Sequence, residues 1–584
     1  MTSSLYRLAR QAVLLVPLMT CAISVHAQQI LGCRDATPAE ATLYSTPMMM
    51  PGVISPKDGT CFIKDLRILT HDGLKLAANV FLPATGTSGQ ASGPRFPSLL
   101  YISSWASAEW FEYLGQQHRM ARAGYVSLSY TTRGFWNSEG TVGVAGEEDV
   151  RDVSSAIDFM LAYTPADPQR IGSAGISYGA GLSLLGAAKD RRIRALAALS
   201  GWGNLADQLY GNDVPNPTWL GILTASGQML GRMDPTVLSF ARIALNPDAT
   251  QQQARELKAW AALRSPSSVV NELNARQPAI FIGKNWQDDI FSPNSTLAMF
   301  SRLTTPKKIM LQPGIHASVE LGAAVFDKAN PVWDEARRWF DHYLKGVPNA
   351  IDTEPKVTLK TKFGNVVETL PDWPAPELRS ESMWINPRGA VRYDESCQCT
   401  KGQTGSLSAQ RGAFGLDTIN NALDTVATTG PMPVLSATLE AKGLPVLAQQ
   451  NMILRDQGVR YEGPVQAQDM RIRGAPRIQL RVRPSQSRGM LVAYLYDVNP
   501  SGWGTLITHG ARAVHWAKPG EGIDFSFDMN AIAYDLPAGN RLALVFDTKD
   551  HLYGVPVRFG EAFSMTIEAG DGVSALTVPV RPIH

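Results

Sequence analysis

The chain is short of charge and of long apolar runs, and each shortage narrows the range of functions. Charged residues are only 18% of the 584 residues and the formal net charge is +2, so no nucleic-acid partner is expected. Beyond the N-terminal segment no apolar run is long enough to cross a bilayer, so no stable membrane insertion is expected. The length exceeds what one hydrophobic core supports, which predicts roughly two to four domains.

Residues 1–27 have the pattern of a secretory signal. Arg7 and Arg10 precede an apolar stretch, and a small-residue cleavage site ends at Ala27. Because the stretch is too short to anchor the chain in a membrane, we expect a mature protein exported to the periplasm or the medium. A weak lipoprotein box ending at Cys21 leaves lipid attachment as the minor alternative.

Cysteine is scarce, and removal of that segment leaves Cys33, Cys61, Cys397 and Cys399. An even number of cysteines in an exported protein favours disulfides. Cys33 and Cys61 would tie down the N-terminal arm, whereas Cys397 and Cys399 could form a tight ring or pair elsewhere. No metal site is expected, because no histidine lies near the second pair.

The hydrophobic pattern indicates an α/β domain that follows an irregular arm at residues 28–60. Residues 61–203 alternate strands with helices, which predicts a largely parallel sheet covered by helices on both faces. Residues 204–270 break that alternation, being loop-rich at first and helical at 248–263, and are expected to form a cap over the site. The α/β pattern then returns over residues 271–370.

Residues 371–584 have a different character, with short alternating segments separated by Gly, Pro, Asn and Asp. Segments 476–483, 490–498 and 541–546 are examples, and no strong helix pattern remains. This predicts an all-β domain, most simply a sandwich or jelly roll.

The most informative motif is Gly175-Ile176-Ser177-Tyr178-Gly179. It follows a predicted buried strand and precedes an Ala/Gly/Leu-rich predicted helix. Strand, G-x-S-x-G and helix in that order are typical of a nucleophile elbow, where a sharp turn lifts a serine hydroxyl above the sheet. Ser177 is therefore the candidate nucleophile, although a glycine-rich turn without chemistry is the alternative.

A serine hydroxyl becomes a good nucleophile only when a base accepts its proton and a carboxylate orients that base. Downstream of Ser177 in the α/β domain the histidines are His316, in a loop after a strand, and His342, inside a predicted helix. We expect His316 to be the base and His342 to pack or cap. Asp288 and Asp289 follow a predicted strand, and the spacing favours Asp288 as the acid.

An oxyanion hole requires two donors directed at the developing negative charge. The backbone N–H of Tyr178, which follows the nucleophile, is the first candidate. The second candidate is the indole N–H of Trp105, which could instead form a pocket wall. Further tryptophans at predicted carboxyl ends of strands could line an apolar acyl pocket or simply pack the core: Trp110, Trp136, Trp202 and Trp286.

Several segments resemble the family of cocaine esterase and X-Pro dipeptidyl-peptidase, which also includes cephalosporin acylases and α-amino-acid ester hydrolases. The resemblance lies in the elbow and in further motifs, in the family's order: TRG at 132–134 with SEG at 138–140, WQD at 286–288, PGIH at 313–316, WFDHYLKG at 339–346, DVNPSG at 497–502 and LPAGNR at 536–541. It implies an α/β-hydrolase fold with a helical cap and a C-terminal jelly roll, and it carries the family's triad onto Ser177, Asp288 and His316.

The chain departs from the family at two points. Trp105 stands where the family often has a tyrosine donor, and the carboxylate that usually precedes Arg133 is a threonine, so Arg133 is expected to be a structural ion-pair hub. The resemblance implies a cofactor-independent serine hydrolase acting on small-molecule esters or amides. The alternatives are an X-Pro or aminoacyl peptidase, and a non-catalytic protein that binds carbohydrate or polymer.

Overall fold

The structure is a computed structural model that describes residues 60–83, 94–109, 111–364, 366–396, 399–422, 424–554 and 560–583. The predicted signal, the N-terminal arm, Trp110, Cys33 and Cys397 lie outside these residues. The side chain of Cys399 is not described either, so the disulfides remain a prediction. Within the described residues no helix is long and apolar enough to cross a membrane.

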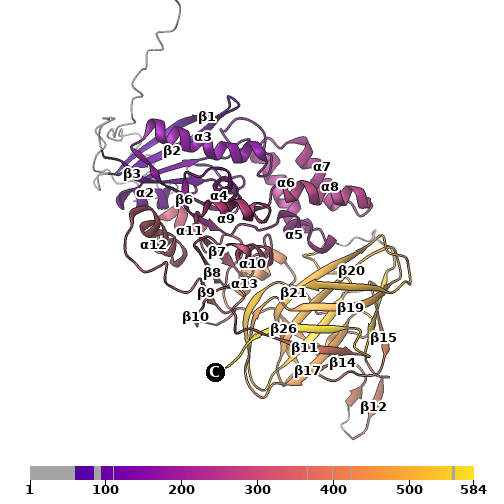
Figure 1. The fold of residues 1–584 in the computed structure, drawn as a ribbon. Helices are drawn as coiled ribbons and strands as arrows, with labels where there is room; N and C mark the ends of the chain where they lie inside the picture. The colour runs from indigo at the N-terminus through magenta and orange to yellow at the C-terminus, as the bar shows by residue number, and fades with distance from the viewer. Residues whose placement is uncertain are drawn as a thin grey trace, which may run out of the picture.

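The first domain is built on a 10-stranded sheet in the order β1-β2-β4-β3-β5-β6-β7-β8-β9-β10 (Figure 1). The strands from β4 to β9 in that order pair in parallel, whereas β1, β2 and β10 pair antiparallel at the edges. The strands are β1 (Cys61–Leu69), β2 (Lys75–Leu82), β3 (Phe96–Ile102), β4 (Val126–Tyr130), β5 (Ala166–Ile176), β6 (Ile193–Leu199), β7 (Ala279–Asn285), β8 (Lys307–Gln312), β9 (Val357–Lys360) and β10 (Val367–Leu370).

Helices cover both faces of this sheet, which is why its central strands are almost continuously buried. One face packs against α2 (Leu114–Arg122), α11 (Leu321–Phe326) and α12 (Pro331–Lys345). The other packs against α3 (Glu147–Tyr163), α4 (Tyr178–Lys189), α9 (Val270–Arg276) and α10 (Pro293–Arg302). The predicted α/β-hydrolase fold is therefore confirmed.

The insertion between β6 and β7 is helical from its start, which differs from the predicted loop-rich first half. Its helices are α5 (Leu205–Leu209), η1 (Gly211–Asp213), α6 (Pro217–Leu230), α7 (Pro235–Leu245), α8 (Gln251–Ala262) and η2 (Pro266–Val269). The Asn216-Pro217 and Asp234-Pro235 pairs, which indicate turns in a sequence, are helix starts here. In each pair the first side chain caps the helix and the proline occupies its first turn.

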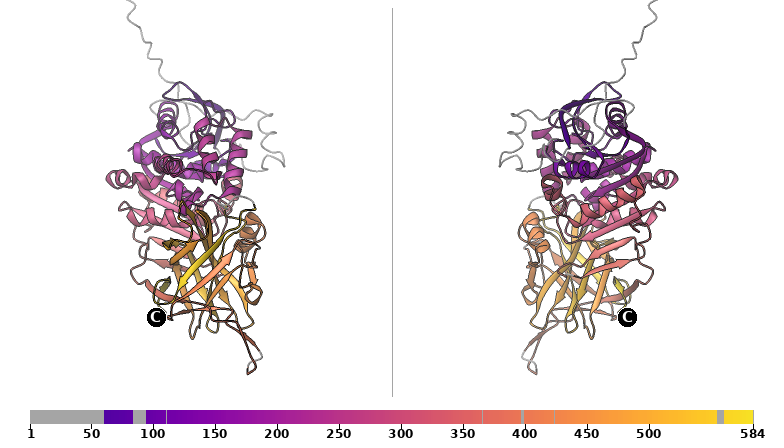
Figure 2. Two further views of the ribbon diagram at one scale, coloured as in Figure 1. Left: turned by 90° about the vertical axis from the view of Figure 1, so that its right-hand side faces the viewer. Right: turned by 90° about the vertical axis from the view of Figure 1, so that its left-hand side faces the viewer.

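The C-terminal domain is all-β apart from short helical segments. A system of 14 hydrogen-bonded strands includes β11 (Arg379–Asn386), β18 (Met470–Gly474), β19 (Arg477–Pro484), β20 (Arg488–Val498), β21 (Trp503–His515) and β24 (Arg541–Asp547). Helix α13 (Pro433–Ala441) interrupts the β pattern, contrary to the expectation of no helix. The domain lies beside the first domain, beneath the cap helices in Figure 1, and Figure 2 shows the same stacking from either side.

Two buried ion pairs join the domains. Arg473 of β18 has a fully buried side chain and donates to both carboxylate oxygens of Glu368 on β10, at 3.0 and 2.6 Å. Lys362, just past β9, lies 2.9 Å from Glu440 of α13 and also donates to the backbone carbonyl of Leu506 at 2.9 Å. The end of the first sheet is therefore held by charges inside the β domain.

Replacement of Arg473 by methionine should destabilise this junction, because it leaves the Glu368 carboxylate with Arg581 alone, at 3.1 Å. Loss of one member of a buried pair costs about 3–5 kcal/mol when the other charge has no further partner, so we expect a smaller loss here, seen as a lower temperature of thermal unfolding. Arg477→Met is the matched control: its pair with Asp528 is exposed, and the change should be close to zero. Equal unfolding temperatures for the two variants would contradict this account.

Candidate active site

Ser177 sits at the turn between β5 and α4, and the turn is possible only because glycines flank it. Its backbone has φ 54° and ψ −114°, a conformation that non-glycine residues rarely adopt. A Cβ on Gly175 would lie 2.2 Å from the carbonyl carbon of Gly179, and a Cβ on Gly179 would lie 2.0 Å from the carbonyl oxygen of Ile102. The G-x-S-x-G spacing is thus a steric requirement of the turn.

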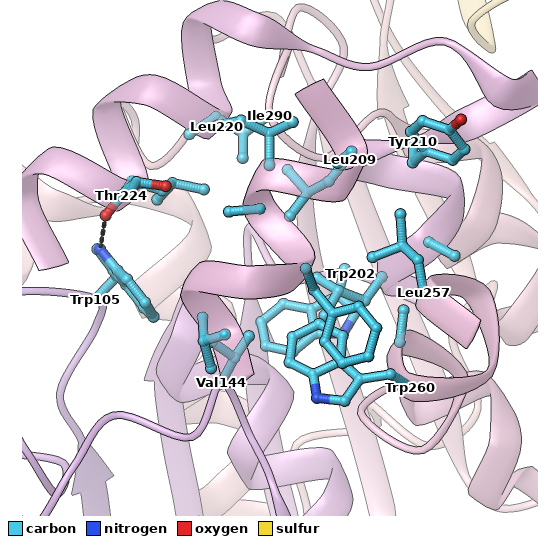
Figure 3. Close-up of a pocket in the computed structure, with 18 of the residues that line it drawn as sticks. Trp105, Val144, Trp202, Leu209, Tyr210, Leu220, Thr224, Leu257, Trp260 and Ile290 are labelled. Carbon is cyan, nitrogen blue, oxygen red and sulfur yellow. Dashed lines mark hydrogen bonds between the residues drawn. The ribbon is translucent and has the colours of Figure 1, made fainter. Parts of the chain in front are cut away.

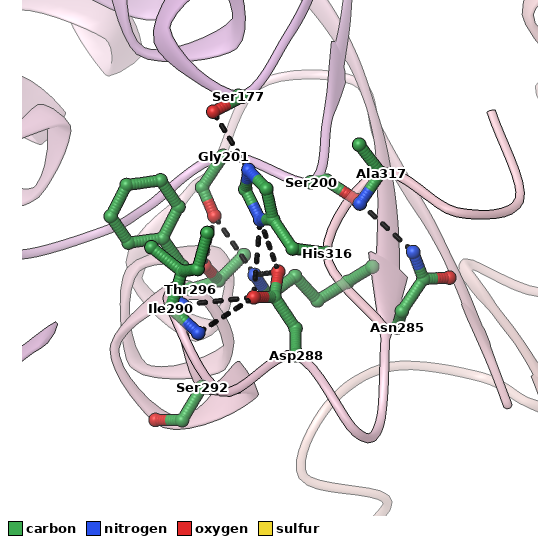
Figure 4. A network of polar contacts seen from close by, with 12 residues as sticks. Ser177, Ser200, Gly201, Asn285, Asp288, Ile290, Ser292, Thr296, His316 and Ala317 are labelled. Atoms are coloured by element: carbon green, nitrogen blue, oxygen red, sulfur yellow. Dashed lines mark hydrogen bonds and ion pairs between the residues drawn. The ribbon is translucent and has the colours of Figure 1, made fainter. Parts of the chain in front are cut away.

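The structure brings Ser177, His316 and Asp288 together (Figure 4). His316 Nε2 lies 2.8 Å from Ser177 Oγ, and Nδ1 lies 3.1 and 3.0 Å from the two carboxylate oxygens of Asp288. His316 is on the loop after β8 and Asp288 on the loop after β7, so both reach the same edge of the sheet as the elbow. A neutral imidazole protonated on Nδ1 would donate to Asp288 and accept from Ser177.

Asp288 is a fully buried carboxylate that accepts several hydrogen bonds. The backbone N–H groups of Ile290 and Phe291 donate to Oδ1 at 3.1 and 2.9 Å, and Lys284 Nζ donates to Oδ2 at 2.8 Å. Burial alone would raise the pKa of Asp288, but the charges of His316 and Lys284 outweigh it and lower the pKa to about 2. This stabilisation is present above the ordinary value of 3.8 and is lost as the pH falls through about 2.

Asp289, the alternative acid, is directed elsewhere. Asp289 lines a polar cavity between the cap, α10 and the β domain, and its backbone carbonyl accepts from Asn216 Nδ2 at 2.9 Å. Burial, with repulsion from Asp288, holds the pKa of Asp289 well above its usual range. Of the two candidates, Asp288 is the one that contacts His316.

The two oxyanion candidates differ in the structure. Tyr178 is the first residue of α4, and amide groups in the first turn of a helix have no acceptor within it, so its N–H is available above Ser177. The indole N–H of Trp105 instead donates to the Leu223 carbonyl at 3.1 Å and to Ser226 Oγ at 3.2 Å, both on α6. The indole is therefore a pocket wall and a tether to the cap, which corrects its prediction as a donor.

An apolar cavity of about 100 Å³ opens beside Ser177, between the sheet and the cap (Figure 3). No Asp, Glu, Lys, Arg or His belongs to the described residues that line it. The cavity is lined mainly by aromatic and aliphatic side chains, among them Trp105, Trp202, Leu209, Tyr210, Leu220, Leu257, Trp260, Ile290 and Phe291. Its size is of the order of engineered apolar cavities of roughly 150 Å³ that bind benzene.

The predicted pocket tryptophans are only partly in this cavity. Trp202 lines it, but Trp136 and Trp286 do not, which corrects their prediction. Trp136 is 41% exposed and its indole N–H donates to the Ala106 carbonyl. Trp286 is buried, and its indole N–H donates to the Lys360 carbonyl of β9. A position at the end of a strand fixes where the backbone lies but not the direction of the side chain.

Three contributors escaped the sequence analysis. Trp260 lies on α8 and Phe291 just after the acid loop, and both line the cavity. Lys284 is the last residue but one of β7 and reaches Asp288 from within the core. An aromatic residue in a predicted cap helix could have indicated Trp260, but nothing in the sequence indicates that a lysine in a buried strand faces the acid.

Arg133 and His342 make contacts that stabilise the fold. Arg133 makes a two-point contact with Asp152 on α3, at 2.7 and 2.6 Å, and lies 3.1 Å from Asp72. His71, Asp72 and Asp152 have a spacing that could hold a metal ion, but the Arg133 guanidinium is bonded to both aspartates. His342 is near the end of α12 and its Nδ1 lies 3.2 Å from the Val347 carbonyl oxygen.

An arrangement of hydroxyl, imidazole and buried carboxylate with these contacts can carry out nucleophilic acyl transfer. We expect a fluorophosphonate probe to label Ser177, because such probes react with an activated serine hydroxyl. Labelling should be lost in Ser177→Ala and retained in Ser183→Ala, whose hydroxyl is buried between α4 and the sheet, 2.8 Å from Ser173 Oγ of β5. Peptide mass spectrometry after labelling would identify the residue, and labelling of Ser177→Ala would contradict the assignment.

Comparisons with known proteins agree with this geometry. Residues 72–318 match the model of the X-Pro dipeptidyl-peptidase (S15) family, and residues 349–564 match the model of the X-Pro dipeptidyl-peptidase C-terminal non-catalytic domain. A protein of Streptomyces avermitilis, named provisionally as a Xaa-Pro dipeptidyl-peptidase, is 23% identical over 72% of this chain and 66% of its own length. The chain thus spans slightly less than two thirds of that relative.

Solved structures share the fold at low sequence identity. An α-amino acid ester hydrolase superposes with a TM-score of 0.65 at 16% identity, covering 92% of this chain and 100% of its own. A CocE/NonD family hydrolase from Staphylococcus aureus superposes with a TM-score of 0.66 at 12% identity, covering 89% of this chain and 94% of its own. With both models matched in order, the chain carries a peptidase domain of the X-Pro dipeptidyl-peptidase (S15) type at residues 72–318 and an X-Pro dipeptidyl-peptidase C-terminal domain at residues 349–564, the domains of a serine hydrolase.

Proposed function

We propose that the protein hydrolyses carboxylic esters whose acyl group is small and apolar. The observation that carries the proposal is the position of the apolar cavity, which Ser177 and Tyr178 line together with the cap. A carbonyl placed at Ser177 would direct its acyl substituent into that cavity. Burial of the substituent would contribute roughly 25 cal/mol for each Å² of apolar surface removed from water.

The contacts support a two-step mechanism. His316 Nε2 accepts the proton of Ser177 Oγ as the oxygen attacks the carbonyl, and Asp288 holds the imidazole and stabilises its charged form. The Tyr178 N–H would donate to the oxyanion. In this fold the second donor of the oxyanion hole is a main-chain N–H of the loop after β3. His316 then protonates the leaving alcohol, and a water activated by the same imidazole releases the acid.

Peptidase activity on substrates with a free amino terminus is the competing function, because relatives carry that name. A protonated amine beside the scissile bond would need an anionic or strongly polar partner once it is desolvated. Among the described residues the cavity offers no carboxylate, and Asp289 belongs to the separate polar cavity. Ile290 lines both cavities, with its apolar side chain between them. The cavity beside Ser177, which would take the acyl group, is therefore separate from the polar one.

Turnover of p-nitrophenyl esters tests the proposal directly. We expect hydrolysis of short acyl and benzoyl esters, and little hydrolysis of aminoacyl- or prolyl-p-nitroanilides. The activity should fall on the order of 10⁴-fold or more in Ser177→Ala, as it does when a triad serine is removed. Anilide turnover without ester turnover would instead assign the protein to the peptidases.

The cavity also predicts a change in chain-length preference. Leu257 of α8 lines the cavity, so Leu257→Ala should enlarge it and move the optimum of kcat/KM toward longer acyl chains. The matched control is Leu238→Ala on α7, because Leu238 lines a neighbouring surface groove of the cap and not this cavity. An identical chain-length profile for both variants would show that the acyl group binds elsewhere.

A further inference from the structure

A lysine is buried directly behind the triad acid. Lys284 Nζ lies 2.8 Å from Asp288 Oδ2, and the side chains of both residues are 0% exposed. The same ammonium group donates to the Gly201 carbonyl at 3.1 Å, just beyond β6. Lys284 therefore connects the ends of two neighbouring strands to the acid loop, at the edge of the sheet that carries the site.

Few other charges face this pair. Glu320, at the start of α11, is buried and accepts from Ser200 Oγ at 3.1 Å and from Asn285 Nδ2, and its charge acts on both Lys284 and His316. Asp289 acts on Asp288 from the polar cavity. Lys284 is the positive group in contact with Asp288 besides His316 itself, among the described residues.

We propose that Lys284 is a positioning residue of the active site. It holds the Asp288 carboxylate against His316 and offsets the negative charge of that carboxylate. This role rests on the proposed function, in which His316 is the general base.

The physical argument concerns charge and orientation. An isolated buried carboxylate strongly favours the imidazolium form of a contacting histidine, and a nearby ammonium disfavours it. Burial lowers the pKa of Lys284 below its ordinary value, and the charge and hydrogen bond of Asp288 oppose that shift. Since Oδ1 is already held by two backbone N–H groups, the contact with Lys284 fixes Oδ2 and with it the plane of the carboxylate.

Two variants separate charge from hydrogen bonding. Lys284→Met removes both the charge and the donor, whereas Lys284→Gln removes the charge and keeps an N–H donor. Lys307→Met is the matched control, because Lys307 is another buried lysine on the adjacent strand, paired with Asp372 at 3.0 Å away from the triad. It should lower stability without affecting His316.

The readout is protonation of His316, followed by NMR in ¹⁵N-histidine-labelled protein and assigned with His316→Gln. In both Lys284 variants we expect the midpoint to rise by about one pH unit, the usual effect of one nearby charge. The acid limb of the kcat/KM profile for an ester should move by the same amount, and Lys307→Met should move neither. If both Lys284 variants titrate as the unmodified protein does, the proposal is wrong.

Other outcomes are equally decisive. A shift in Lys284→Met but not in Lys284→Gln would reduce Lys284 to a hydrogen-bond donor and overturn its electrostatic role. If the Lys284 variants fail to fold, the ¹⁵N signal of Lys284 Nζ in the unmodified protein at pH 7 decides, because a neutral amine would overturn the proposal. An NMR shift without any ester turnover would support the role of Lys284 and reject the proposed substrate, since the titration needs no catalysis.

Discussion

The active site depends on one close backbone contact, that of Gly179 with the carbonyl of Ile102. A single added methyl group at Gly179 would lie 2.0 Å from that oxygen, so the contact tolerates no side chain. It holds the start of α4 against the end of β3, while the N–H of Ser177 bonds to the Leu199 carbonyl of β6 at 2.8 Å. Three strands thereby fix the height and direction of the nucleophile before any partner is added.

The loop after β7 divides two different environments. Asp288 contacts His316, Asp289 lines a polar cavity at the junction with the β domain, and Ile290 lines both the polar and the apolar cavity. The chain turns and bends over these residues, so their side chains point in different directions and this short segment supplies a carboxylate for His316, a polar wall and an apolar wall. The cavity beside Ser177 is apolar because the cap covers it with side chains that carry no charge.

Much of this architecture could be predicted from the sequence, and the failures have physical causes. The strand–turn–helix context of G-x-S-x-G is local, so Ser177 and the order of the elements followed from residues adjacent in the chain. The early cap helices were missed because Asn-Pro and Asp-Pro begin helices as readily as they form turns. Trp105, Trp136 and Trp286 were assigned roles that depend on side-chain direction, which neighbours distant in the sequence determine. The role of Lys284 could not be predicted, since its pairing with Asp288 depends on the path of the loop after β7.

The buried ion pairs at the domain junction bear on how the protein could be divided or recombined. Lys362 and Glu368 lie at the end of the first sheet, yet their partners, Glu440 and Arg473, lie among the elements of the β domain. In a fragment that ends near Leu370, the Lys362 ammonium and the Glu368 carboxylate would lose their partners and face solvent. The edge of the first sheet beside them would be uncovered. A chimaera that replaces the β domain must therefore supply both partners, a carboxylate in the place of Glu440 and a guanidinium in the place of Arg473.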